Sequence, residues 1–216
     1  RPYLNRIAKV SPEGKVDFIH LNPLPPDQPK RSEGLATPFA IDATDGLICL
    51  TAAGSDQLVT LDSTSGKILG RVKVGAVPRG IKLELDGQGK PKTAWVFNAV
   101  ENSLSKIDLR LPESPKLIDE LPLHDPTPAH YKVGRIAFNT ARASSFNTAS
   151  CASCHPDGHT DHQLWVLDTP HLVGADQIEP RLSQTLRGLR GTAPYHWDGV
   201  PGDPYGGTNA STRKFL

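Results

Sequence analysis

Two segments within the first 125 residues repeat each other, and this repeat limits the fold more than any other feature of the sequence. The first copy begins at Thr37 and the second at Val77. If about five extra residues are allowed in the second copy around "GQGKP", prolines, Asp-Gly pairs and aspartates align. The matched positions are Pro38 with Pro78, Asp45-Gly46 with Asp86-Gly87, and Asp62 with Asp108. A period of roughly 40 residues, with several short apolar runs per unit, predicts the blades of a β-propeller.

The blades are too few to close a ring. The preceding stretch "NRIAKVSPEGKVDFIHL" matches the end of one more blade, which gives two to three blades in all. Closed propellers have about four blades or more. We therefore expect residues 1–125 to form a partial all-β propeller, either because the sequence is a fragment or because other chains complete the ring. The pattern "VGAVPRGI…DG…N…NSLSKIDL" resembles the YVTN-type β-propeller repeat.

Charge and hydropathy exclude several classes of function. The net charge is +1 and no run of five or six like charges occurs, which argues against a protein that binds nucleic acid or an anionic membrane. No apolar run approaches the about 18 residues that span a bilayer. The start, "RPYLNRIAKV", lacks the apolar core of a secretory signal. Three cysteines argue against a disulfide framework, and Cys49 in "GLICLTA" is expected to be a buried strand thiol.

The composition changes after "LPLHDPTPAHY", which predicts an interdomain linker and a boundary between residues 125 and 126. The next stretch, "KVGRIAFNTARASSF", loses the two-residue alternation and gains alanine, which predicts a helix. The remainder of residues 126–216 is loop-rich, with a short helix expected near "EPRLSQTLRGL".

The stretch "CASCH" is the clearest indication of chemical function in the sequence. Two cysteines separated by two residues and followed by a histidine are typical of c-type haem attachment. Cys151 and Cys154 would form thioether bonds to the porphyrin, and His155 would be the proximal axial ligand of the iron. The alternatives are a chance match or a zinc site built from both cysteines and two nearby histidines among His155, His159 and His162. Zinc fingers usually place the second ligand pair about a dozen residues away, which favours haem.

Two stretches resemble the bacterial di-haem cytochrome c peroxidase superfamily: "AFNTARASSFNTASCASCHPDGHTD" and "SQTLRGLRGTAPYHWDG". A YVTN-type propeller joined to such a domain also resembles a group of exported bacterial fusion proteins. The resemblance implies a mixed, multidomain fold, in which the partial propeller is followed by a mainly α, loop-rich cytochrome c-type domain over residues 126–216. Two departures stand out. The superfamily's Pro-Tyr-Phe-His-Asp-Gly order becomes "PYHWDG" here, and the chain has a single CxxCH motif.

The second axial position of the iron has no methionine to fill it, because the chain contains none. A histidine, another weak ligand, water or no ligand remains, and replacing methionine predicts a lower reduction potential. His171 and His196 lie far enough along the chain to reach the opposite face of a haem, and we favour His196 because "APYHWDG" surrounds it with aromatic residues. Arg187 and Arg190 in "TLRGLRG" are candidate partners of the haem propionates, unless they are ordinary surface arginines.

Three functions compete on these residues. The first is single-electron transfer through one covalent haem c, which would exchange electrons with a redox partner protein or a second haem domain. The second is a peroxidase- or oxidase-type haem enzyme, which requires an open iron. The third is a propeller interaction module with a structural haem. Because haem c is attached outside the bacterial cytoplasm, the resemblance also implies a periplasmic or otherwise exported protein.

Overall fold

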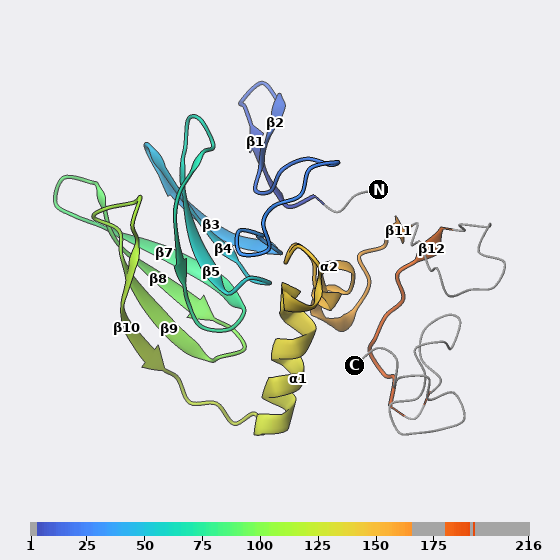
Figure 1. The fold of residues 1–216 in the computed structure, drawn as a ribbon. Helices are drawn as coiled ribbons and strands as arrows, with labels where there is room; N and C mark the ends of the chain where they lie inside the picture. Colours follow the sequence, from blue (N-terminus) through green and yellow to red (C-terminus); the bar gives the residue numbers. More distant parts are fainter. Residues whose placement is uncertain (1–3, 166–179, 191, 193–216) are drawn as a thin grey trace. The chain divides into compact units, whose positions relative to one another are not determined.

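The computed structural model describes residues 4–165, 180–190 and 192 (Figure 1). The chain divides into two compact units, Arg1–Cys154 and His155–Leu216, and each is described by itself below. The domain boundary predicted between residues 125 and 126 stays a prediction.

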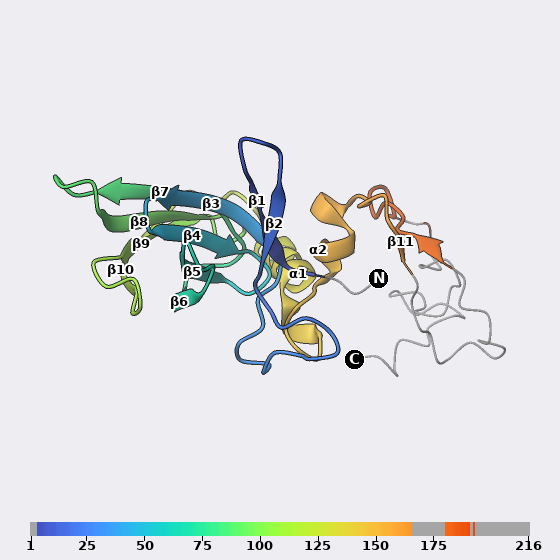
Figure 2. The same cartoon turned by 90° about the horizontal axis from the view of Figure 1, so that it is seen from above.

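The first unit contains two four-stranded antiparallel sheets whose strands lie in sequence order. The first sheet is formed by β3 (Pro38–Thr44), β4 (Leu47–Ala52), β5 (Gln57–Asp62) and β6 (Ile68–Lys73). The second is formed by β7 (Pro78–Leu85), β8 (Pro91–Asn98), β9 (Ser103–Asp108) and β10 (Lys116–Pro122). Four strands joined by consecutive turns are the architecture of a propeller blade, and the two blades lie next to each other (Figure 2).

The aligned positions of the repeat occupy the same places in both sheets. Pro38 and Pro78 begin the first strands, and Asp62 and Asp108 end the third strands. The extra residues around "GQGKP" lengthen the turn between β7 and β8. The repeat inferred from the sequence is therefore confirmed.

A hydrophobic core lies between the two sheets and a second core lies on the other face of the first sheet. Leu47, Cys49 and Leu58 pack against a set of residues from the second sheet: Leu83, Ala94, Val96 and Ile107. Ile48, Leu50, Val59 and Leu61 point to the opposite face, because successive strand residues alternate. There they pack with Ile7 of β1 (Arg6–Val10), with Ile19 of β2 (Val16–His20) and with Leu21, which directly follows β2. The strands β1 and β2 form a hairpin. This two-sided burial explains why every residue of β4 is buried and all but Thr51 are apolar, and Cys49 is the buried strand thiol that was expected.

The connections into the two four-stranded sheets share one contact, called a joint here: an Asp or Asn side chain accepts a hydrogen bond from the residue before the first strand. The residue directly before the third strand of each sheet is an Asp or Asn with positive φ, Asp56 at 52° and Asn102 at 59°. Asp56 accepts a hydrogen bond from the backbone N–H of Val77, the residue before Pro78. Asn5, which directly precedes β1, does the same for Thr37, the residue before Pro38. The hairpin β1–β2 therefore corresponds to the outer half of a blade, as the sequence predicted.

The last of these joints differs. Asn102 donates from its side-chain amide to the backbone carbonyl of His124 at 2.6 Å, and the chain then enters helix α1 (Ala129–Asn139). Helix α1 follows Thr127-Pro128, and β3 begins at the proline of Thr37-Pro38, so a helix stands where a further blade would begin. Its Ile136 packs against Ala53, Ala76, Val77 and Val100 at the turn end of the sheets. The helix predicted from "KVGRIAFNTARASSF" is confirmed in its first part: α1 begins three residues earlier and ends at Asn139, and the rest of the stretch forms a 3₁₀ turn at Ala141–Ala143 and a loop.

The expected mainly α cytochrome-type domain is wrong. The residues that the structure describes form four sheets, and their α-helices are α1 and the four-residue α2 (Cys151–Cys154). Beyond Cys154 the second unit contains a 3₁₀ turn, η2 (Pro156–Gly158), and the paired strands β11 (Leu164–Trp165) and β12 (Arg181–Leu182). The short helix expected near "EPRLSQTLRGL" is also absent from residues 180–190, because Arg181 and Leu182 pair with β11 and Gly188 has a φ of 79°.

Candidate functional site

Helix α2 presents the two cysteines of the CxxCH motif on one turn. Its start is fixed by Ser150 and Ser153: the Ser153 backbone N–H donates to the Ser150 carbonyl, and the Ser153 hydroxyl accepts from the Ser150 N–H. This is half of a capping box, with serine in the place of the usual Glu or Gln. Cys151 and Cys154 are three positions apart and so share a helix face. Ala152 is 6% exposed, whereas Cys151 is exposed and Cys154 is partly exposed, so α2 turns its alanine inward and leaves the thiols accessible.

His155 is held by a tight turn of the second unit. Its backbone carbonyl accepts from the Gly158 N–H, and the His159 N–H donates to the Pro156 carbonyl. Asp157 and Gly158 both have positive φ, 51° and 72°, a conformation that glycine adopts without strain. The turn brings the His159 carbonyl oxygen to 3.1 Å from the His155 ring Nδ1. When Nδ1 donates its proton there, Nε2 presents its lone pair, which is the tautomer that a metal-ligating histidine requires.

Arg187 supports the same turn from the segment 180–190. Its guanidinium Nη2 donates to the Asp157 carbonyl at 3.2 Å, and the Leu186 N–H donates to the Gly158 carbonyl at 2.9 Å. Arg190 lies exposed in the same segment. The predicted pairing of these arginines with propionates stays a prediction. His196, the candidate distal ligand, lies outside the described residues, as does His171.

A hydrogen-bond network around Asp161 was not predicted as such from the sequence. One Asp161 oxygen accepts from the Ser183 hydroxyl and from the Gln163 N–H, and the other accepts from the Trp165 indole N–H at 2.9 Å. Thr160 donates to the Ser183 carbonyl at 2.6 Å. Partial burial works against ionisation, but the hydrogen bonds outweigh it and lower the pKa of Asp161. The network joins β11 to β12, and the local sequence carries no signal for a contact across 22 residues.

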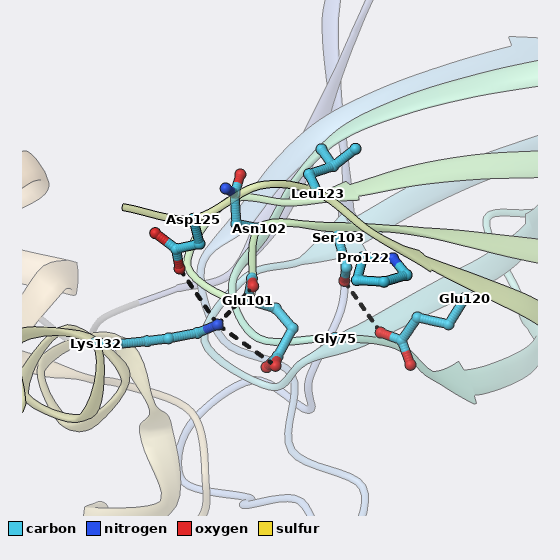
Figure 3. A pocket seen from close by; sticks show the side chains of 9 residues that line it. All are labelled: Gly75, Glu101, Asn102, Ser103, Glu120, Pro122, Leu123, Asp125 and Lys132. Carbon is cyan, nitrogen blue, oxygen red and sulfur yellow. Dashed lines mark hydrogen bonds and ion pairs between the residues drawn. The ribbon is translucent and has the colours of Figure 1, made fainter. Parts of the chain in front are cut away.

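A pocket of about 590 Å³ lies at the end of the second sheet and was also missed by sequence reasoning. Lys132 of α1 reaches into it and donates to the Glu101 carbonyl at 2.7 Å (Figure 3). Its ammonium also lies 3.4 Å from an Asp125 carboxylate oxygen and 3.8 Å from a Glu101 oxygen. On the opposite wall the Ser103 hydroxyl donates to Glu120. These contacts tie α1 and the preceding linker to the turn between β8 and β9.

Each of the two units supplies part of what a covalent haem requires of a CxxCH motif. Among residues 4–165, 180–190 and 192, no group of three or more His, Cys, Asp or Glu side chains is placed to hold a metal ion. The zinc alternative needs four ligands together and stays untested, because its cysteines and its histidines belong to different units. Haem c needs two accessible thiols and one oriented imidazole from this motif. The exposure of α2 and the Nδ1 hydrogen bond of His155 meet those needs.

Comparison with known proteins does not place the chain in a family. No protein-family model and no curated protein matches it. Among solved structures, it is similar to hydrazine synthase from Kuenenia stuttgartiensis (22% identity, TM-score 0.35), covering 42% of this chain and 24% of that one. It is also similar to a protein of unknown function from Desulfotomaculum acetoxidans (18%, TM-score 0.41), covering 56% and 36%. It is similar as well to a protein from Lactobacillus plantarum (14% identity, TM-score 0.41), covering 58% of this chain and 38% of that one.

The chain thus spans 24% to 38% of the length of these solved chains. The TM-scores are too low to assign a fold, so the blade architecture rests on the strand pairing itself. The identification with the di-haem cytochrome c peroxidase superfamily joined to a YVTN-type propeller is wrong: no family model matches, the described chain is mostly β, and it holds no cluster of metal-ligating side chains. What remains is a protein with consecutive propeller-type blades and a CxxCH motif.

The helices that the structure describes are also too short or too polar to cross a bilayer.

Proposed function

We propose that the protein is a c-type haem protein that transfers single electrons, with haem attached at Cys151 and Cys154 and His155 as the proximal ligand. The observation that carries the proposal is the hydrogen bond between His155 Nδ1 and the His159 carbonyl. A histidine that follows CxxC by chance has no need of an oriented ring, whereas a proximal ligand does. The turn "HPDGH" supplies that orientation, and Arg187 braces it.

The residues of the chain have separable roles in this proposal. Cys151 and Cys154 anchor the macrocycle through thioether bonds on one helix face, and Ser150 and Ser153 fix the start of that helix. His155 offers Nε2, while its Nδ1 hydrogen bond makes the ring a stronger donor. Haem iron supplies a reversible one-electron couple. We further propose His196 as the distal ligand, a redox protein or haem domain as the partner, and export from the bacterial cytoplasm.

The test is expression of the chain in a bacterial host that matures c-type cytochromes. The purified protein should be red, should gain the mass of one haem by intact mass spectrometry, and should keep it on acid extraction. Cys151→Ala combined with Cys154→Ala should abolish this gain. Cys49→Ala is the matched control, because Cys49 is fully buried in β4 and should leave attachment unchanged. A colourless protein of unmodified mass would overturn the proposal.

The coordination of the iron decides between electron transfer and ligand activation. For electron transfer we expect low-spin spectra in both oxidation states and slow or absent carbon monoxide binding by the ferrous protein. Rapid binding would instead mean an open iron and would count against His196 as a ligand. The variant His196→Ala should convert a low-spin spectrum to one that responds to carbon monoxide.

A further inference from the structure

The chain immediately ahead of the CxxC helix is held by loops of the blades at several separate points, all within the first unit. The Ala141 N–H donates to the Gly54 carbonyl at 2.8 Å, and Arg31 Nη2 donates to the Arg142 carbonyl at 2.6 Å. Asn5 Nδ2 donates to the Thr148 carbonyl at 2.9 Å. These donors and acceptors lie 87 to 143 positions away in sequence from the residues they hold, as the pairs Ala141–Gly54 and Asn5–Thr148 show.

Gly34 makes the closest of these approaches. A Cβ atom built on Gly34 would lie 2.0 Å from the Phe146 carbonyl oxygen and 2.9 Å from that of Asn147. Its φ is outside the left-handed region, so glycine is needed here for space and not for backbone conformation. The following Leu35 and Ala36 are fully buried, which prevents the backbone at Gly34 from moving away from Phe146 and Asn147. The segment 146–147 therefore lies directly against the backbone of the 30–36 loop.

Asn5 uses both ends of its amide. Its Oδ1 accepts from the Thr37 N–H, the joint that Asp56 also makes with Val77. Its Nδ2 donates to Thr148, a contact for which an aspartate has no donor. Asn5 is 4% exposed, so losing either bond leaves a polar group without water. The amide thus connects the first blade to the residue that lies three positions before Cys151.

We propose that Gly34 and Asn5 are positioning residues for the proposed haem: they form a cradle that fixes helix α2 against the blades and thereby sets the reduction potential. The cradle consists of Asn5, Arg31, Gly34 and Gly54 together with the segment 141–148 that they contact. The inference rests on the proposed function. Reduction potentials depend on solvent exposure and on ligand geometry, so a shift of the segment carrying both thiols must change them.

The test compares Gly34→Ala with Gly87→Ala. Gly87 has no atom within 4 Å of a built Cβ and no positive φ, so alanine there meets nothing. In haem-free protein lacking both motif cysteines, Gly34→Ala should speed amide hydrogen exchange at Thr148 and Ser153 by about tenfold, and Gly87→Ala should not. In haem-loaded protein, Gly34→Ala should shift the midpoint potential while Gly87→Ala leaves it unchanged.

If Gly34→Ala does not fold, Asn5→Asp replaces it, because aspartate keeps the acceptor for Thr37 and loses the donor to Thr148. Exchange rates and potentials equal to wild type in the folded variants would overturn the cradle. Failure of haem attachment in the wild type would overturn the proposed function and, with it, the effect on the potential, whereas the exchange measurement needs no haem and would still test whether the cradle fixes helix α2. Changed exchange with an unchanged potential would reduce the cradle to a purely structural contact and would also reject the proposal.

Discussion

The carboxylate of Asp56 accepts a hydrogen bond from the backbone N–H of Val77 at 3.0 Å, and this contact joins the turn of the first sheet to the start of the second. Val77 is 1% exposed and has a φ of 60°, an unfavourable conformation for a β-branched residue. The contact therefore holds a strained, buried residue in place at the point where one blade becomes the next.

Removing this joint should weaken the contact between the sheets. Asp56→Ala leaves the buried Val77 N–H without an acceptor and should lower the free energy of unfolding by about 1–3 kcal/mol. Asp56→Asn keeps an acceptor, as Asn5 does at the equivalent position, and should recover most of the loss. Urea denaturation followed by circular dichroism measures both. Equal stability of the alanine variant and wild type would show that the joint contributes nothing.

Thr60 connects the first sheet to the loop between β9 and β10. Its hydroxyl lies 2.7 Å from the Pro112 carbonyl oxygen, and the residue is fully buried. Thr60→Val preserves the shape but leaves that carbonyl without its donor, so we expect a loss of about 1–2 kcal/mol in unfolding free energy. Thr64→Val, on the turn after β5, is the control, because Thr64 is exposed. A loss no larger than that of the control would contradict the prediction.

The three cysteines should differ sharply in reactivity before haem is attached. Burial, with a smaller effect from the charge of Asp42, raises the pKa of Cys49 to about 12. Thiolate is the reactive form, so Cys49 should resist iodoacetamide at pH 8 while the exposed Cys151 is alkylated. Peptide mapping by mass spectrometry reads the sites, and in urea Cys49 should react as well. Alkylation of native Cys49 at the rate of Cys151 would show that β4 is not a closed core strand.

Asp161 should make stability depend on pH in the acid range. Its pKa is lowered in the folded protein, so its ionised form contributes stability above the ordinary carboxyl pKa, and that contribution is lost as pH falls through the lowered value. Asp161→Asn should therefore lose stability relative to wild type at pH 7, and the difference should shrink below about pH 4. Urea denaturation at both pH values is the measurement. A difference that grows on acidification would reverse the sign and reject the network as the cause.

Local patterns predicted the blades because strand alternation and Asp-Gly turns are encoded in neighbouring residues. The matched prolines Pro38 and Pro78 lie where they were expected. The cytochrome-like domain was predicted from the motif "CASCH" and from the resemblance of two short stretches to a known superfamily, and such local matches carry no information about how the segments around the single-turn helix α2 fold. Contacts such as Asn5 with Thr148, or Asp161 with Ser183, are hydrogen bonds between residues that lie far apart in the sequence and meet only in the folded chain. No periodicity in the sequence marks them.

Asn102 holds His124 with the same kind of side chain that elsewhere joins one sheet to the next. The chain therefore leaves the second sheet through the same kind of side-chain contact that connects the two sheets. This contact fixes the direction in which the residues after His124 begin.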